Sequence, residues 1–201
     1  MATRAKSMTT TAPLQLRDYQ QECLSSLGAA ARRGVKRMLV ALPTGTGKTV
    51  VFSQIPSMIK GGRRMLVVAH REELLDQAAA EISRANPALT VDMEQAKLHA
   101  SPWANVVVAS IQTLAVSPQR LEGLVPESIA VLVVDEAHHA PATSYVKLFA
   151  RLGLAPDIDA LSESTKTARS RLLQEFKPGP AAPTLIGFTA TPHRTDTIGL
   201  E

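Results

Sequence analysis

The sequence predicts a domain of the α/β class with a mostly parallel β-sheet, and two features of the chain lead to this prediction. Short apolar runs of strand length alternate with longer segments whose apolar residues recur at helical spacing. Polar residues follow the ends of several runs, and ligands of open α/β sheets bind at the carboxyl ends of the strands. The expected strands are residues 38–42, 65–69, 105–109, 129–134 and 184–188, with a further short strand at 89–93. The expected helices are residues 18–33, two that begin near 48 and 72, and residues 145–152 and 160–176.

Size and composition are those of an ordinary globular chain. The 201 residues suit one large domain or two very small ones, and 45% hydrophobic with 20% charged residues allows a buried core. No apolar run approaches the roughly 20 residues of a membrane span, so no membrane partner is expected. The single Cys23 excludes an internal disulfide and a zinc site built from several cysteines.

The amino-terminal segment carries most of the net charge of +4. Residues 1–17 contain Arg4, Lys6 and Arg17 and no acid, whereas the rest of the chain has 19 basic side chains against 18 acidic ones. A basic surface on the folded part would therefore be a local patch. Residues 1–13 are expected to lie outside the domain, as a short organelle transit segment or a disordered tail, and both interpretations remain open.

The first helix offers a candidate contact to a nucleotide base. Asp18 with Gln21 three residues later resembles a capping box at its start. Gln20 lies in the first turn, and a glutamine amide can pair with the N6 and N7 edge of adenine. A solvated helix glutamine is the alternative. The position of Gln20, one helix upstream of a glycine-rich turn, favours the adenine contact.

The segment after the first strand has the features of a phosphate-binding loop. Gly45 and Gly47 let the backbone bend so that its N–H groups converge on an anion, and the following helix directs its positive dipole end there. Lys48 would contact the β- and γ-phosphates, and the Thr49 hydroxyl would coordinate the accompanying magnesium ion. Leu42 replaces the first glycine of the strict spacing, so the loop resembles the variant of helicases rather than that of kinases or small GTPases. The residues expected to hold the nucleotide are Pro43, Thr44, Gly45, Thr46, Gly47, Lys48 and Thr49.

Polar residues follow two further strands. His70 and Arg71 lie at a strand's carboxyl end, where Arg71 is suited either to a phosphate backbone or to a local salt bridge. Ser110, Gln112 and Thr113 follow the next strong strand and can hydrogen-bond phosphates. Ser110 is also suited to be an ordinary helix N-cap, and the two roles are compatible.

The most apolar strand ends in two carboxylates. A carboxylate at the tip of a buried strand is costly without a cation partner, so Asp135 is interpreted as the residue that holds magnesium from its outer shell. Glu136 is interpreted as the base that orients and deprotonates the attacking water. A zinc site of Asp135, His138 and His139 is the alternative. It is disfavoured because adjacent histidines do not share a helical face and no His-x-x-x-His spacing is present.

Residues 155–183 depart from a simple alternating pattern and are expected to be an insertion. Apolar spacing predicts the helix at 160–176, and a Pro- and Gly-rich linker follows at 177–183. The last strand leads into Thr189 and Thr191, whose hydroxyls would lie at the same carboxyl edge. A threonine-rich turn before a proline is the alternative.

Six stretches in fixed order resemble the superfamily 2 helicases of the DEAD/DEAH-box type. The match covers roughly residues 14–196 and looks most like the branch of type III restriction subunits, bacterial DNA-repair translocases and fungal mitochondrial branched-DNA helicases. The chain departs from the family pattern in two places. This branch often has proline where this chain has Asp18, and the segment 155–183 is longer than a usual crossover. The six stretches are Leu16–Gln20, Pro43–Thr49, Val68–Leu74, Val108–Leu114, Val134–His139 and Gly187–Pro192.

This resemblance implies a RecA-like P-loop NTPase fold with helices on both faces of the sheet, and nucleic-acid-stimulated ATP hydrolysis that drives movement along DNA. The implied nucleotide residues are Gln20 for adenine, Lys48 and Thr49 for phosphate and magnesium, and Asp135 and Glu136 for magnesium and water. The implied residues along the nucleic-acid path are His70, Arg71, Ser110, Gln112 and Thr113. The implied coupling residues between nucleotide and nucleic acid are His138, Thr189 and Thr191.

The family resemblance also implies a partner domain. Such enzymes use a second RecA-like domain that supplies an Arg to the γ-phosphate, so the chain is expected to be one half of a motor, with residues 197–201 beginning the linker. RNA in place of DNA, and a non-catalytic nucleotide-binding module that regulates a partner, remain alternatives. The expected location is the mitochondrial matrix, with the nucleus or cytoplasm as alternatives.

Overall fold

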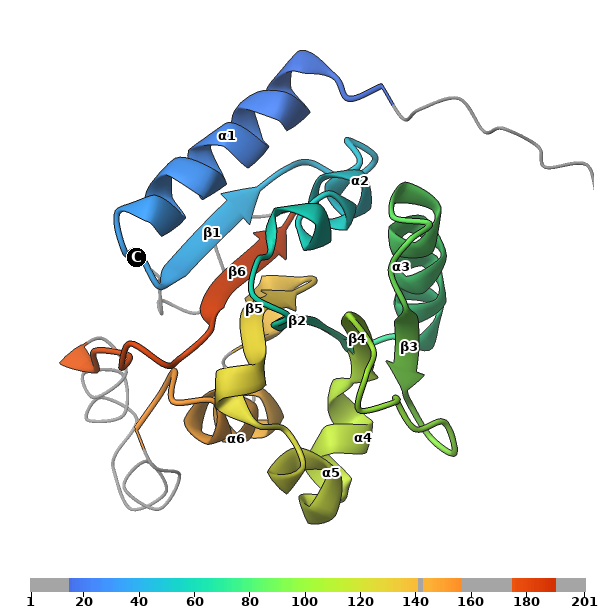
Figure 1. Ribbon diagram of the computed structural model, residues 1–201, viewed down its shortest axis with the longest axis vertical. Coiled ribbons are helices and arrows are strands. Elements are labelled where there is room, and N and C mark those ends of the chain that lie inside the picture. Colours follow the sequence, from blue (N-terminus) through green and yellow to red (C-terminus); the bar gives the residue numbers. More distant parts are fainter. Residues whose placement is uncertain (1–14, 141–142, 157–174, 191–201) are drawn as a thin grey trace, which may run out of the picture.

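In the part of the chain that the structure describes, six parallel strands form one sheet at the centre (Figure 1). The structure is a computed structural model, and it describes residues 15–140, 143–156 and 175–190. The strand order is β1-β6-β5-β2-β4-β3, and all neighbours are parallel. The strands are β1 Arg37–Ala41, β2 Arg64–Ala69, β3 Val91–Glu94, β4 Val106–Ser110, β5 Ile129–Val134 and β6 Thr184–Thr189. The α/β class and the mostly parallel sheet are confirmed.

Helices cover both faces of the sheet, as Figure 1 shows. Helices α1 to α3 lie on one face, and α4 to α6 lie on the other. The α-helices are α1 Asp18–Arg32, α2 Lys48–Ser53, α3 Glu72–Ala85, α4 Ile111–Val116, α5 Pro118–Glu122 and α6 Thr143–Arg151. The 3-10 turns are η1 Pro56–Met58, η2 Pro126–Ser128 and η3 Ala137–His139. None of the helices in the described residues has the length and apolarity needed to cross a bilayer.

The central strands are apolar at nearly every position, apart from Arg64 at the start of β2 and Ser110 at the end of β4, because both of their faces are buried. In β2, Leu66 and Val68 pack into the core beneath α4 and α6, whereas Met65, Val67 and Ala69 pack into the core beneath α2 and α3. This alternation follows from the two-residue period of a strand. The continuous apolar runs therefore indicate a sheet sandwiched between two helical layers.

Basic residues at the amino edge of the sheet anchor the segment that leads into β6. Lys36 Nζ donates to the carbonyl oxygens of Pro180 and Ala182 at 3.1 and 2.8 Å. Arg37 Nη2 donates to the carbonyls of Leu154 and Phe176, both at 2.9 Å. The Pro- and Gly-rich linker expected at 177–183 is thus held against the sheet.

Several expected boundaries are corrected by the structure. The N-cap of α1 is Arg17 and not Asp18, and the capping-box contact runs from the Arg17 amide to Gln20 Oε1 at 3.0 Å rather than involving Gln21. Helix α2 ends at Ser53, because Pro56 has no amide proton with which to continue the helical ladder. Helix α4 begins directly after Ser110, the candidate N-cap, whereas the short helix α5 was not expected. The helix expected at 160–176 falls almost entirely outside the described residues.

Candidate functional site

The polar residues singled out in the sequence gather at the carboxyl edge of the sheet. All six strands are parallel, so the segments that follow them reach the same edge. The strands β1, β6 and β5 are neighbours, and they carry the glycine-rich loop, Thr189 and the Asp135–Glu136 pair. The strands β2 and β4 are neighbours further along, and they carry His70 and Ser110. The edge therefore has two halves, one around the loop and one around β2 and β4.

The loop between β1 and α2 depends on its glycines. Gly45 and Gly47 have φ angles of +80° and +83°, which disfavour any residue with a Cβ. A Cβ at Gly47 would also lie 2.7 Å from Nε2 of Gln20. The Thr46 hydroxyl donates to the Pro43 carbonyl at 2.6 Å, which closes the turn. The backbone has the compact, left-handed bends that a phosphate-binding loop needs.

Two side chains of α1 bind one carbonyl of this loop. The Tyr19 hydroxyl and Gln20 Nε2 donate to the carbonyl oxygen of Thr46 at 2.6 and 3.0 Å. Gln20 is 5% exposed, and its Oε1 accepts the Arg17 amide at 3.0 Å. Gln20 thus lies directly beside the loop, with both ends of its amide engaged by the chain. The role of Tyr19 was missed, because its place on the apolar face of a helical pattern gave no sign of the polar contact.

Lysine 48 and Glu136 meet across the site. Lys48 Nζ lies 3.0 Å from Glu136 Oε1, and their side chains are 12% and 28% exposed. Glu136 has φ +52° and ψ +54°, a left-handed conformation that is costly for a residue with a Cβ. Such strain in a non-glycine residue is typical of functional sites. The conformation turns the Glu136 side chain toward the loop.

Glu136 is linked onward to β6. His138 Nδ1 lies 3.3 Å from Glu136 Oε2 and 3.3 Å from Thr189 Oγ1. Gly187 permits this arrangement, since a Cβ there would lie 2.8 Å from the Cβ of Ala137 in η3. The structure thus joins Lys48, Glu136, His138 and Thr189 in one chain of contacts. Thr191 lies outside the described residues.

Asp135 is buried beside this pair. Its side chain is 6% exposed, and Oδ1 accepts the Glu136 amide at 3.0 Å. Burial raises the pKa of Asp135 above its ordinary value, and the Glu136 charge adds to this. The backbone hydrogen bond and the charges of Lys48 and His138 lower the pKa in part. The neighbouring charges and the hydrogen bond thus do not fully offset the cost of burying the Asp135 carboxylate, which is consistent with a group that binds a cation.

The oxygen groups available here suit magnesium better than zinc. The Thr49 hydroxyl and the Asp135 carboxylate are hard oxygen donors, and magnesium is usually held by one or two such groups together with phosphate oxygens and water. Within the part of the chain that the structure describes, no three or more His, Cys, Asp or Glu side chains form a metal-binding group. A magnesium ion would therefore be completed by a nucleotide and water.

The second half of the edge is a hydrogen-bonded network. Gln112 Nε2 donates to the His70 carbonyl at 2.6 Å and lies 2.8 Å from His70 Nδ1. The Ser110 hydroxyl donates to Gln112 Oε1 at 2.9 Å and accepts the Thr113 amide at 3.4 Å, so Ser110 is the N-cap of α4. Thr113 Oγ1 accepts the Ala96 amide at 3.1 Å. Arg71 is exposed at the N-cap of α3, next to His70.

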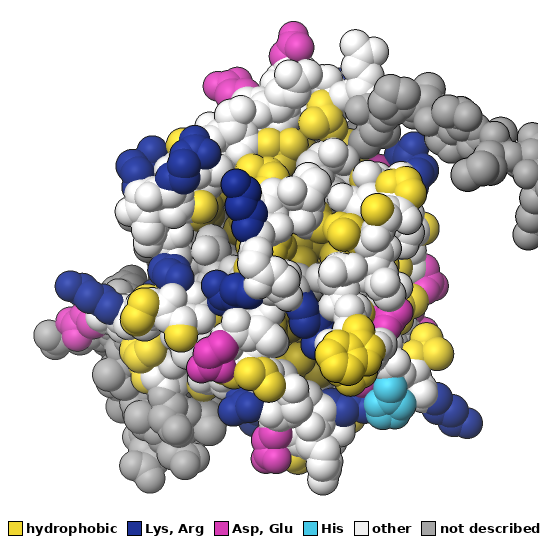
Figure 2. Space-filling model, in the orientation of Figure 1, with side chains coloured by type: hydrophobic (Ala, Val, Ile, Leu, Met, Phe, Trp, Pro, Cys, Tyr) yellow, Lys and Arg dark blue, Asp and Glu magenta, His cyan; other side chains and the backbone are white. Residues whose placement is uncertain are grey.

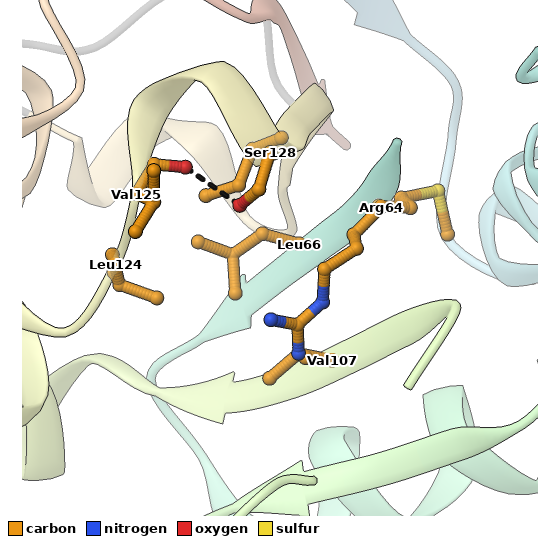
Figure 3. A pocket seen from close by; sticks show the side chains of 8 residues that line it. Arg64, Leu66, Val107, Leu124, Val125 and Ser128 are labelled. Atoms are coloured by element: carbon orange, nitrogen blue, oxygen red, sulfur yellow. Dashed lines mark hydrogen bonds between the residues drawn. The ribbon is translucent and has the colours of Figure 1, made fainter. Parts of the chain in front are cut away.

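A small cavity lies at the opposite edge of the sheet and contributes nothing to this site. It is lined at the starts of β2, β4 and β5 by Arg64, Leu66, Val107 and Ser128, among others (Figure 3). The guanidinium of Arg64 donates to two main-chain carbonyls, which leaves the cavity mainly apolar. It has none of the converging polar groups found at the carboxyl edge.

Comparison with known protein families shows to which family the chain belongs. Residues 13–194 match the family described as type III restriction enzyme, res subunit (ResIII). The chain belongs to this family. A Saccharomyces cerevisiae protein that bears the name ATP-dependent helicase IRC3 is 34% identical over 195 residues, covering 92% of this chain and 25% of that protein. A Schizosaccharomyces pombe protein, named as the mitochondrial ATP-dependent helicase irc3, is 32% identical over 191 residues, covering 93% and 28%. The chain thus spans about a quarter of these curated relatives.

Solved structures agree on the fold. The helicase domain of Hef from Pyrococcus furiosus matches with a TM-score of 0.58 and 26% identity, over 90% of this chain and 34% of that one. The SWI2/SNF2 ATPase core of Sulfolobus solfataricus, in complex with double-stranded DNA, matches with a TM-score of 0.59 over 94% of this chain and 34% of that one. At 16% identity this second match shows the fold alone. The expectation of an N-terminal RecA-like domain of the superfamily 2 helicase type is confirmed.

Proposed function

We propose that this ResIII chain is the first motor domain of an ATP-dependent DNA helicase or translocase. The observation that carries the proposal is the Lys48–Glu136 ion pair, 3.0 Å long, which spans from the glycine-rich loop to the tip of β5. A lysine for phosphate and a carboxylate for water are thereby brought to one place. A purely structural ion pair would not require the left-handed Glu136 or the two left-handed glycines.

In this proposal ATP competes with Glu136 for Lys48. The triphosphate takes Lys48 Nζ away from Glu136, because its charge exceeds that of one carboxylate. Glu136 is then free to accept a hydrogen bond from the attacking water and to take its proton. The same side chain thus neutralises Lys48 before nucleotide arrives and acts as the base afterwards.

Magnesium would be held by Thr49 and Asp135. When bound, the ion neutralises charge that builds up on the β- and γ-phosphates. Thr49 lies at the second position of α2, and Asp135 lies at the end of β5, so the two side chains approach from different elements. The raised pKa of Asp135 favours this role, since a nearby cation would relieve the cost of its burial.

Gln20 would read adenine after a change of partner. Its amide now bonds the Arg17 amide and the Thr46 carbonyl, so an adenine contact requires at least one of these bonds to be exchanged. The exchange would transmit the presence of the base directly to the loop through Thr46. Pro43, Thr44 and Thr46 would complete the cradle around the phosphates.

The β2–β4 half of the edge would hold one strand of DNA. His70, Arg71, Ser110, Gln112 and Thr113 offer donors suited to phosphate oxygens. His138, Thr189 and Thr191 would couple this half to the nucleotide. Lys and Arg side chains are scattered over one whole face of the molecule, with acidic ones among them (Figure 2), so DNA contact is expected to be local.

DNA is preferred over RNA on the names of the relatives. A Sulfurisphaera tokodaii protein that is 27% identical over 183 residues bears the name DNA 3'-5' translocase XPB2. Phosphate contacts alone do not separate the two polymers, since discrimination requires contacts to the 2′-hydroxyl. An RNA helicase domain is therefore the second candidate, and a non-catalytic nucleotide-binding module is the third.

The domain plan follows the family. Residues 14–196 form the first RecA-like domain in this proposal, residues 155–183 are an insertion, and 197–201 lead to a second RecA-like domain that supplies an Arg to the γ-phosphate. Residues 1–13 are the candidate transit segment. The mitochondrial matrix is the proposed location, because the fission yeast relative is named as mitochondrial.

Steady-state ATP turnover by the full-length gene product tests the proposal. Single-stranded, duplex and branched DNA are compared with RNA of the same sequence. Stimulation by DNA supports the motor assignment. Stimulation by RNA alone would favour the RNA helicase, and tight ATP binding without turnover on any polymer would favour the regulatory module.

A further inference from the structure

The described part of the chain contains a buried hydroxyl without a partner, in the core cluster that includes the end of β5. Tyr145 is in the first turn of α6 and is 1% exposed. Its ring packs into the core together with Leu132, Val134 and Ala137, the residues of β5 and η3 that flank Asp135 in the chain. The hydroxyl oxygen is inaccessible to solvent, and it makes no hydrogen bond within the described residues.

The hydroxyl of the other tyrosine, in contrast, has a hydrogen-bond partner. Tyr19 donates its hydroxyl to the Thr46 carbonyl at 2.6 Å. Buried tyrosine hydroxyls normally find such a partner, because burying a donor without one is costly. Phenylalanine would fill the site of Tyr145 without that cost, and the neighbouring Phe149 shows that a phenyl ring packs well here, with the two ring centroids 6.3 Å apart.

Asp135 is the carboxylate that Val134 and Ala137, two residues of the same core cluster as Tyr145, bracket in the chain. Burial raises the pKa of Tyr145 to about 12, and the charge of Asp135 adds to the rise, although the two groups share no hydrogen bond in this structure. The phenol therefore keeps its proton and remains a donor at neutral pH. Asp135 has capacity to accept, since only Oδ1 is engaged by the Glu136 amide and a carboxylate offers about four acceptor sites.

We propose that Tyr145 is a positioning residue for Asp135: in the nucleotide-bound protein its hydroxyl donates a hydrogen bond to the Asp135 carboxylate and fixes the orientation in which that carboxylate faces magnesium. This inference rests on the proposed function. Before nucleotide binds, Glu136 is held by Lys48, and Asp135 by the Glu136 amide, so the hydroxyl waits without a partner. Release of Glu136 from Lys48 frees the turn after β5 to bring the two groups together.

The experiment measures binding of a fluorescent ATP analogue by the 201-residue chain across a magnesium titration. The variant Tyr145→Phe removes one oxygen atom and keeps the ring. We expect the magnesium concentration at half-saturation to rise about tenfold, as for loss of one charge-assisted hydrogen bond. Affinity for the analogue in EDTA is expected to remain unchanged, and the melting temperature without nucleotide is expected to be equal or higher.

The variant Tyr19→Phe is the matched control. It also removes one phenol oxygen, but from a hydroxyl that has a partner. We therefore expect it to lower the melting temperature and to lower the affinity for the ATP analogue both with and without magnesium. An unchanged magnesium midpoint in Tyr145→Phe would overturn the inference and leave the proposed function intact. A lower melting temperature without nucleotide would also overturn it, because the hydroxyl would then have a structural partner. Failure of the unaltered chain to respond to magnesium would overturn the proposed function together with the inference.

Discussion

At the scale of single residues, the site holds several groups in positions that folding alone would not favour. Asp135 is buried, Glu136 is left-handed, and two glycines adopt positive φ angles around the loop. Strain and uncompensated burial of this kind lower stability, and they persist where a ligand or a reaction needs them. Substitutions at these positions are expected to change stability and ligand binding separately.

Replacing Asp135 by Asn is expected to stabilise the nucleotide-free protein at neutral pH. Burial raises the pKa of Asp135, so the folded state favours the protonated carboxyl, and stability is lost as the pH rises above the ordinary value of 3.8. Asn keeps the acceptor for the Glu136 amide without the charge. The variant should therefore melt at a higher temperature than the unaltered chain at pH 7, and the difference should vanish below about pH 4. Thermal unfolding from pH 3 to 8 tests this, and a lower melting temperature of Asp135→Asn at pH 7 would contradict it.

Gly47→Ala is expected to be more harmful than Gly45→Ala. Both positions have φ near +80°, so each alanine carries about 1–2 kcal/mol of backbone strain. A Cβ at Gly47 also meets Gln20 Nε2 at 2.7 Å, whereas nothing lies within 4 Å of a Cβ at Gly45. Melting temperature and ATP affinity of the two variants check this. Equal losses would show that the contact between Gln20 and the loop does not constrain residue 47.

At the scale of the elements, the strands were predicted to within about two residues, and so were the bounds of α1 and α6 and the starts of α2 and α3. Apolar runs define the strands because both faces of the sheet are buried, and β5 was predicted with its exact bounds. Helix caps depend on local side-chain contacts, which is why Arg17 and not Asp18 caps α1, and the five-residue helix α5 is too short to show a helical period in the sequence. The residues of the site could be named, since a parallel sheet brings its carboxyl ends together. Their pairing could not be predicted, because it depends on strand order and side-chain conformation.

Helix α1 connects a candidate base-reading residue to the phosphate loop, and Gln20→Ala tests this connection. ATP affinity should fall about tenfold, within the ~1–3 kcal/mol of a bidentate base contact, while the affinity for inorganic triphosphate should fall much less. Competition by ATP, GTP and triphosphate against a labelled nucleotide measures the difference. If ATP and GTP compete equally well against the unaltered protein, Gln20 does not read adenine.

At the scale of the whole molecule, the proposed nucleotide site at the carboxyl edge of the sheet would need an Arg from the proposed second RecA-like domain for rapid turnover. The 201-residue chain alone should therefore turn over ATP very slowly, even with DNA, since an arginine finger contributes about 10³–10⁵ in rate. DNA binding should be weak and sensitive to salt. Steady-state ATPase is measured for the chain alone and after addition of the separately produced second domain. Brisk DNA-stimulated turnover by the chain alone would show that no second domain is needed.

The Lys48–Glu136 pair is the centre of the account, and equilibrium ATP binding by three proteins tests it most directly. The unaltered chain, Lys48→Ala and Glu136→Gln are titrated with ATP and magnesium under identical conditions. Lys48→Ala should lose measurable binding, because it removes the charge partner of the phosphates. Glu136→Gln should bind ATP at least as tightly as the unaltered chain, because it removes the carboxylate that competes for Lys48 Nζ at 3.0 Å. Equal loss of ATP affinity in both variants would contradict the account.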